Sequence, residues 1–178
     1  VMANDFTDGL ALQAIKLAFE YLEASVKYND PEAREKMHNA STMAGMAFGN
    51  AFLGINHSMA HKIGGMFHTV HGRTNAILLP FVIRYNGTRP SKQANWPKYN
   101  YYKADIKYQE IAKLLGLTAN TPEEGVKNLA QAVYDLGERV GIKMSLKDQG
   151  IDELEFMSKT EEMAYLAFED QCTPVNPR

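Results

Sequence analysis

The histidines of this chain are concentrated in one short stretch. Four of the five lie between positions 57 and 71: His57, His61, His68 and His71. A neutral imidazole binds transition metals, and the same ring can accept or donate a proton near neutral pH. On a helix, His57 and His61 would lie about 40° apart around the axis and about 6 Å apart along it. Such a pair can share one metal ion, or one ring can bind the metal while the other faces a substrate.

A third imidazole follows at His71, 14 positions after His57 (71 − 57), with Gly64-Gly65 between them. This spacing allows one helix to end, the chain to turn and His71 to return toward the same point. An isolated pair of histidines four positions apart is more often solvated or packed than part of a site. The clustering of four histidines in an apolar, glycine-rich stretch weighs against that interpretation, but the pattern alone leaves both open.

Helical periodicity dominates the segments that would position these histidines. Apolar residues recur at helical intervals between positions 10 and 22, which predicts an amphipathic helix with Thr7 as its N-cap. A second helix is predicted to start with Asp30 as the cap and Pro31 in the first turn, where the missing N–H of proline is not needed. This second helix is expected to run to position 49.

Two glycines interrupt the second predicted helix. Gly45 and Gly49 lie one turn apart on one face, and glycine inside a helix costs about 1 kcal/mol. The pair therefore indicates close approach of another helix or of a cofactor. Asn56 is expected to cap the helix that carries the first histidines, and the nearly all-apolar segment 74–85 is expected to form a buried helix.

The rest of the chain continues the helical pattern after a loop. Segment 86–102 is rich in Pro, Asn, Lys and Tyr and is expected to be a surface loop. Thr121-Pro122-Glu123-Glu124 is a capping box that opens a further helix. Ser158 with Glu161 repeats this signal before the last helix. Because no β alternation and no internal repeat is found, the predicted fold is all-α.

The composition is that of one ordinary globular domain. The chain has 178 residues, of which 45% are hydrophobic and 22% charged, and a formal net charge of −2. This length can bury a core, and the charge argues against nucleic acid as a partner. No stretch approaches the roughly 20 apolar residues of a membrane span. The single cysteine, Cys172, excludes an internal disulfide and indicates the reducing cytoplasm.

The histidine stretch and its flanks resemble the signature of a known enzyme family. The run 54–65, followed by His71-Gly72 and segment 75–80, resembles the signature of the iron-containing (group III) alcohol dehydrogenases. Within this family, the sequence is most similar to the alcohol dehydrogenase half of the bifunctional aldehyde–alcohol dehydrogenases. Further similarity is found in segments 41–48, 82–86 and 170–173. The resemblance covers essentially the whole chain, and it implies the dehydroquinate synthase-like helical domain of that family.

The resemblance also implies roles for individual residues. In this family one Asp and three His hold a divalent metal, usually Fe²⁺ and sometimes Zn²⁺, and the matching ligands here are His57 and His71. His61 matches the histidine beside the nicotinamide of NAD and the substrate, to which proton transfer or positioning is ascribed. Phe48 and Cys172 match positions that look toward the substrate pocket. The implied reaction interconverts small primary alcohols and aldehydes, of the ethanol and acetaldehyde type, with NAD.

Two parts of the family's active site have no counterpart in this sequence. No histidine here has an Asp four positions before it, so the family's D-x3-H ligand pair is absent. The glycine-rich nucleotide-binding domain is absent as well. The resemblance therefore implies that residues 1–178 are a single helical domain, cut at both ends, whose missing partner is the nucleotide-binding domain of the same protein. This fragment is expected to be inactive alone. His38 and His68 match no role.

Two non-enzymatic interpretations stay open. The chain could be a helical assembly module, because faces that normally contact a nucleotide-binding domain could drive association. Bifunctional members of the family form helical filaments, so a homo-oligomer or filament is expected for the parent protein. The chain could also be a stand-alone histidine metal-binding domain. A D-x3-H helix and a nucleotide-binding domain encoded upstream of Val1 would favour the enzyme over both alternatives.

Overall fold

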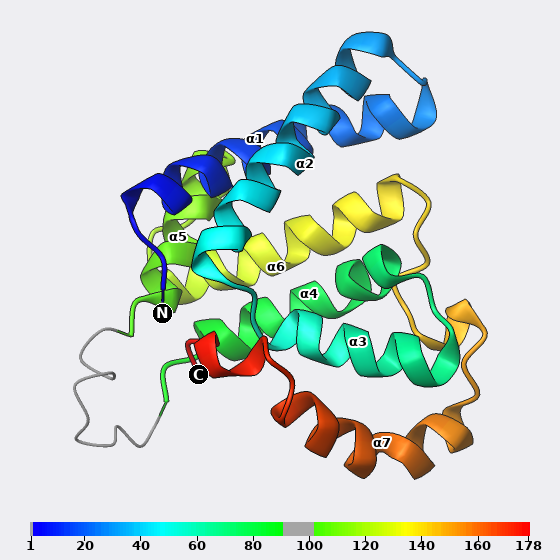
Figure 1. The fold of residues 1–178 in the computed structure, drawn as a ribbon. Helices are drawn as coiled ribbons and strands as arrows, with labels where there is room; N and C mark the ends of the chain where they lie inside the picture. Colours follow the sequence, from blue (N-terminus) through cyan, green and yellow to red (C-terminus); the bar gives the residue numbers. More distant parts are fainter. Residues whose placement is uncertain (1, 91–101) are drawn as a thin grey trace.

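The structure is a computed structural model that describes residues 2–90 and 102–178. Helices are the only regular elements within these two ranges, which confirms the predicted all-α fold (Figure 1). In chain order they are α1 (Asp5–Lys27), α2 (Pro31–Ala51), α3 (Ile55–Phe67), α4 (His71–Gly87), α5 (Ala104–Leu114), α6 (Pro122–Arg139), η2 (Lys147–Gln149), α7 (Glu153–Phe168) and η3 (Thr173–Val175), where η marks a short 3-10 helix. None of the described helices combines the length and the apolar character needed to cross a membrane.

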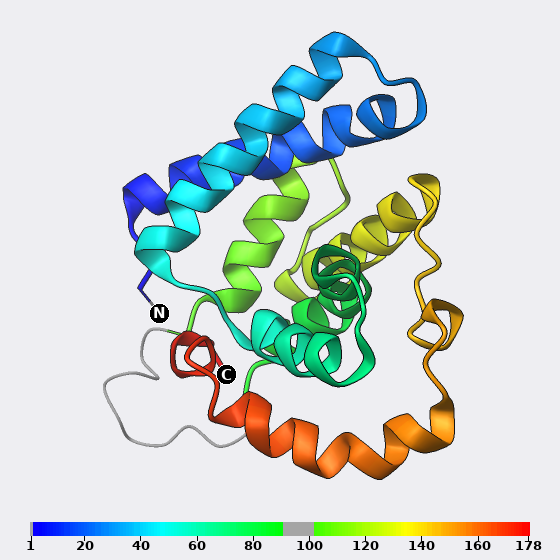
Figure 2. The same ribbon diagram turned by 45° about the vertical axis from the view of Figure 1, so that its right-hand side comes forward.

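The helices pack in groups around separate apolar cores. α1 and α2 form an antiparallel hairpin on one side of the molecule, and Leu17 and Ala40 are buried between them (Figures 1 and 2). α6 packs against both α4 and α5, and this central core includes the buried side chains of Ile83 and Leu129. α7 packs against α3 on the side opposite the hairpin, through a core that includes Met163.

Two of the predicted helix starts are confirmed by the hydrogen bonds of their caps. The Asp30 side chain accepts the backbone N–H three residues later at 2.7 Å, and Pro31 is the first residue of α2. The Thr121 hydroxyl accepts the N–H three residues later at 3.2 Å, and Pro122 begins α6. In both helices the proline occupies a position whose N–H has no partner within the helix.

The starts of α1 and α3 differ from the prediction. Asn4 caps α1, and Thr7 is the third helical residue, whose hydroxyl oxygen accepts the N–H of Asn4 at 2.9 Å in a reciprocal capping box. At α3 the N-cap is Gly54, which has no side chain to offer. Asn56 lies inside the helix instead, and its amide donates to the side chain of Asn75 at 2.7 Å.

The start of α7 also differs, because the prediction chose the wrong capping signal. The N-cap is Asp152, whose side chain accepts the N–H of Glu155 at 2.9 Å. Ser158 lies within the helix, where its hydroxyl donates to the carbonyl of Glu155 at 2.7 Å. Serine forms this back-bond within a helix as readily as it caps one, so the S-x-x-E pattern was ambiguous.

Three expectations about packing and loops also differ from the structure. Outside the backbone of α2 itself, no described atom lies within 4 Å of a Cβ built on Gly45 or Gly49, so the expected close approach of another helix is not found within residues 2–90 and 102–178, and the approach of a cofactor stays a prediction. α4 is amphipathic rather than buried all round, since Phe81 is 60% exposed. α4 also extends into the segment 86–102 expected to be a loop, and residues 91–101 of that segment lie outside the described residues.

The segment that follows α7 returns along α3 and is fixed to it by side chains. The Thr173 hydroxyl donates to the hydroxyl of Ser58 at 2.8 Å, and the Asn176 side chain accepts the N–H of Ile55 at 3.2 Å. Asp170, three positions before Thr173, contacts α3 one turn further along the helix. The regular spacing of these contacts shows that the segment lies antiparallel to α3.

Candidate functional site

Three of the clustered histidines converge in space, as their spacing allows and the family resemblance implies. His57 and His61 lie on α3, and His71 is the first residue of α4. The ring centroids of His57 and His71 are 5.5 Å apart, those of His61 and His71 are 5.3 Å apart, and those of His57 and His61 are 6.2 Å apart. The His61 and His71 rings are nearly parallel, with 15° between their planes. The first half of α3 and the start of α4 therefore present three imidazoles to one point.

The fourth histidine of the cluster, His68, makes the turn that allows this convergence. It is the C-cap of α3, with φ 54° and ψ 34°. This is the left-handed conformation that usually ends a helix and that glycine or asparagine adopts most easily. His68 therefore has a structural role in reversing the chain. His38 is exposed on α2.

The environment of His57 favours the neutral imidazole. Burial, together with the charges that His71 and His61 can carry, lowers the pKa of His57. The Phe48 ring lies 6.5 Å from the His57 ring, centroid to centroid, and adds an apolar neighbour. A neutral ring with a free nitrogen lone pair is the form of histidine that binds a metal.

Two asparagines hold the ring of His71. Nδ2 of Asn75 lies 3.1 Å from Nε2 of His71, and Oδ1 of Asn75 accepts a hydrogen bond from Nδ2 of Asn56 at 2.7 Å. Because the Asn75 carbonyl already accepts from Asn56, the Asn75 amide nitrogen is the group that faces His71. Nε2 of His71 is then the accepting nitrogen, so a metal that binds His71 through this lone pair would take the place of the Asn75 amide.

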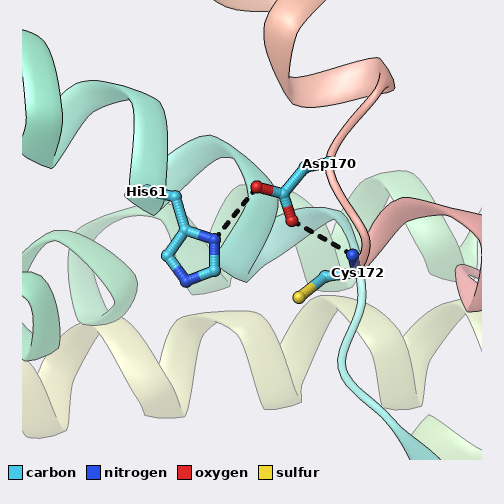
Figure 3. Close-up of side chains that lie close together, drawn as sticks. All are labelled: His61, Asp170 and Cys172. Atoms are coloured by element: carbon cyan, nitrogen blue, oxygen red, sulfur yellow. Dashed lines mark hydrogen bonds and ion pairs between the residues drawn. The ribbon is translucent and has the colours of Figure 1, made fainter.

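A buried carboxylate, Asp170, holds the ring of His61 (Figure 3). Oδ2 of Asp170 lies 3.2 Å from Nδ1 of His61 and 2.9 Å from Nζ of Lys62, and Oδ1 accepts the backbone N–H of Cys172 at 3.0 Å. Burial acts to raise the pKa of Asp170, but the hydrogen bonds from Lys62, Cys172 and His61 outweigh it and hold this pKa below its usual range. Sequence reasoning missed Asp170 as a site residue, because its only signal was membership of segment 170–173.

Cys172 borders the cluster at His61, whereas Phe48 borders it at His57. The Sγ atom of Cys172 lies within 4.8 Å of the ligand atoms of His61 and Asp170, and the side chain is buried. Burial, followed by the hydrogen bond and the charge of Asp170, raises the pKa of the Cys172 thiol. The thiol therefore stays protonated near neutral pH and acts as a small, weakly polar neighbour.

Comparison with known proteins shows which family this chain is similar to. Residues 1–178 match the C-terminal model of the Fe-containing alcohol dehydrogenase family. The chain is 72% identical over 177 residues to an aldehyde-alcohol dehydrogenase of Streptococcus pneumoniae serotype 2 (strain D39). The aligned residues cover 99% of this chain and 20% of that protein. It therefore spans about a fifth of the length of this curated relative.

Solved structures agree with the sequence comparison. The iron-containing alcohol dehydrogenase from Thermococcus thioreducens superimposes with a TM-score of 0.82 and 37% identity, covering 99% of this chain and 42% of that one. A sulfoacetaldehyde reductase from Bifidobacterium kashiwanohense, solved in complex with NAD+, gives a TM-score of 0.74 and 26% identity over 98% of this chain and 40% of that one. The match along its full length shows that this chain belongs to the Fe-containing alcohol dehydrogenase family, as its C-terminal, helical part.

Proposed function

We propose that this chain is the helical half of a metal-dependent, NAD-linked oxidoreductase that interconverts small primary alcohols and aldehydes. The convergence of the His57, His61 and His71 rings from two consecutive helices carries the proposal. The names of the relatives support it, since the Streptococcus pneumoniae protein is an aldehyde-alcohol dehydrogenase and the sulfoacetaldehyde reductase was solved with NAD+. The activity is proposed for the whole protein, of which this chain is a part.

We assign the metal to His57 and His71, and the donor set fits this role. The two imidazoles come from facing positions on α3 and α4, a lowered pKa favours the neutral form of His57, and Nε2 of His71 has a lone pair that a metal could bind in place of the Asn75 amide. Imidazole nitrogens suit Fe²⁺, the metal we favour, and also Zn²⁺. Two protein ligands hold such an ion weakly, and catalytic sites generally use at least three. We therefore expect the remaining ligands from the rest of the protein.

The neighbouring side chains would take up the proton and line the substrate pocket. When bound, the metal would supply Lewis acidity at the alcohol oxygen and NAD would supply a hydride acceptor. His61 would position the substrate hydroxyl and take up its proton. Phe48, which is 45% exposed, would form an apolar wall of the substrate pocket beside His57. Cys172 would line the pocket at His61 as an uncharged thiol.

The domain organisation and the partners follow from the same proposal. Residues 1–178 would form a single helical domain, and a nucleotide-binding domain outside this chain would hold NAD. Large apolar side chains at the ends of α1 and α7 are exposed, namely Phe6 (86%), Leu154 (82%) and Phe168 (75%). Exposed side chains of this kind support association into a homo-oligomer or filament. The single free cysteine, Cys172, supports a cytoplasmic location.

A steady-state assay that follows NADH absorbance tests the proposed function. The full-length protein, loaded with Fe²⁺, is expected to oxidise ethanol with NAD, whereas residues 1–178 are expected to show no measurable oxidation with or without Fe²⁺. Activity of the short chain within about a hundredfold of the full-length control would show that these residues carry a complete site. A metal-loaded full-length protein that oxidises no small primary alcohol would contradict the proposed function.

A further inference from the structure

The geometry points to Asp170 as a positioning residue that fixes the proton of His61 on Nδ1 and leaves Nε2 as the nitrogen that handles the substrate proton. This inference rests on the proposed function, because His61 needs a defined acceptor nitrogen only if it meets a substrate. Asp170 enters the site from the segment after α7, 109 positions away from His61 in sequence. Its role is therefore separate from the ligand role assigned to His57 and His71.

The hydrogen bond between His61 and Asp170 determines which ring nitrogen carries the proton. An ionised carboxylate can only accept hydrogen bonds, and Oδ2 of Asp170 lies 3.2 Å from Nδ1 of His61. Nδ1 must therefore be the donor. In Figure 3 the second ring nitrogen points away from Asp170, so the same contact also fixes the direction in which Nε2 faces. Carboxylates orient catalytic and metal-binding histidines in this way in many enzymes.

Lys62 places a positive charge beside the carboxylate of the His61–Asp170 pair. Its ammonium lies 2.9 Å from the same Oδ2 atom, and the Lys62 side chain is 26% exposed, so Lys62 compensates the charge of the buried carboxylate. Asp170 then does not require a positively charged imidazole as its partner. An imidazole that carries its single proton on Nδ1 keeps a lone pair on Nε2.

The carboxylate itself is held firmly enough to orient a neighbour. Its side chain is 7% exposed, and Oδ1 accepts the backbone N–H of Cys172 at 3.0 Å. Three positions further on, the Thr173 hydroxyl binds the buried Ser58 hydroxyl on α3, the same helix that carries His61. Both partners of the His61–Asp170 contact are therefore fixed to one rigid element.

The same three side chains could be interpreted as a second metal site, because the ligand atoms of His61, Asp170 and Cys172 all lie within 4.8 Å of one another. The position of Lys62 argues against this. Its ammonium already lies on Oδ2 of Asp170, so a metal would have to displace it. We therefore favour the hydrogen-bonded interpretation.

The arrangement defines a proton transfer from the alcohol hydroxyl to Nε2 of His61. During alcohol oxidation the hydroxyl O–H bond would break and an Nε2–H bond would form on His61, while NAD, held by another part of the protein, would supply the hydride acceptor. Asp170 would stabilise the resulting imidazolium through Nδ1–H, as in other carboxylate–histidine pairs. The proton would then pass from the ring to solvent and restore the neutral form.

Asp170→Asn in the full-length enzyme tests this inference with little change in shape. The asparagine amide can donate to Nδ1, which would move the His61 proton to Nε2 and remove the acceptor nitrogen. We expect kcat for alcohol oxidation to fall by about tenfold to a hundredfold, with the metal content and the KM for alcohol little changed. Asp148→Asn is the matched control, because it makes the same chemical change at an exposed position on η2 and should leave kcat unaltered.

A double-mutant cycle separates positioning from a general effect on the fold. If Asp170 acts through His61, then Asp170→Asn should cause no further loss of kcat in the His61→Ala background. A loss of the same size in both backgrounds, or loss of metal from Asp170→Asn alone, would overturn the inference. An unchanged kcat in Asp170→Asn would overturn it as well.

A second measurement does not depend on turnover. In the 178-residue chain labelled with 15N-histidine, the imidazole nitrogen shifts should show His61 as the neutral Nδ1–H form, and as the Nε2–H form in Asp170→Asn. An Nε2–H form in the unmodified chain would overturn the inference. If the shifts agree with it but the full-length protein oxidises no alcohol, the proposed function fails and the positioning of His61 stands.

Discussion

The three converging histidines have different partners although they share one location. His57 is partly desolvated beside Phe48, His71 faces an asparagine amide, and His61 is bonded to a carboxylate. Under the proposed function, these partners, rather than the histidine side chain itself, would separate a metal ligand from a group that handles a proton. A residue type and its spacing therefore locate a site, and the immediate neighbours determine what each residue does there.

Substitution of two glycines by alanine tests the packing at the scale of single side chains. A Cβ added at Gly125 would lie 2.7 Å from Cα of Gln109, whereas one at Gly45 would meet no described atom within 4 Å. Gly125→Ala should lower the free energy of unfolding by about 1–3 kcal/mol, because α5 and α6 must move apart. Gly45→Ala should raise it by about 0.5–1 kcal/mol, because alanine favours the helix. Urea denaturation of both variants measures this, and equal effects would contradict the packing between α5 and α6.

At the scale of the elements, two connections bring the site residues together around α3. The C-cap of α3 is His68 in a left-handed conformation, and α4 begins only three residues later with His71, so the turn is short and its direction is fixed. The segment after α7 is bound to α3 at Asp170, Thr173 and Asn176. The site therefore combines His57 and His61 within α3 with residues that these two connections place beside them.

The start of α7 gives a prediction at this scale. Asp152→Ala removes the side chain that accepts the N–H of Glu155, and we expect a loss of about 1 kcal/mol in the free energy of unfolding. Ser158→Ala is the control, because it replaces an exposed serine inside the same helix with a better helix former and should be neutral or slightly stabilising. Denaturation followed by circular dichroism compares the two. A larger loss of unfolding free energy in Ser158→Ala than in Asp152→Ala would instead support a helix start at Ser158, as expected from the S-x-x-E pattern.

At the scale of the whole molecule, an apolar groove of 510 Å³ lies between α1 and α2 and extends from Ala3 to Phe48 and Phe52. It reaches the histidine cluster at Phe48, whose ring is 6.5 Å from that of His57. Under the proposed function, this surface of the chain would be covered in the complete protein. The proposed metal ligand His57 therefore lies beside an open apolar surface.

The parts that sequence predicts best depend on local periodicity. Helix identity and the convergence of His57, His61 and His71 follow from spacings of a few residues, so both were predictable. The partners of His61 were not, because Asp170 is 109 positions away and reaches the site only through the packing of α7 on α3. The predicted helix starts at Thr7, Asn56 and Ser158 were wrong, because the caps are Asn4, three positions before Thr7, Gly54, two before Asn56, and Asp152, six before Ser158.

The assignment of His57 and His71 as ligands, with His61 beside them, is tested most directly by metal content. Elemental analysis of the purified full-length protein should show that His57→Ala and His71→Ala lose the metal, because each removes one of its ligands. His61→Ala should retain the metal and lose turnover, because it removes the group that takes up the substrate proton. Equal loss of metal from all three variants would make His61 a ligand, and full retention in His57→Ala or His71→Ala would contradict the site.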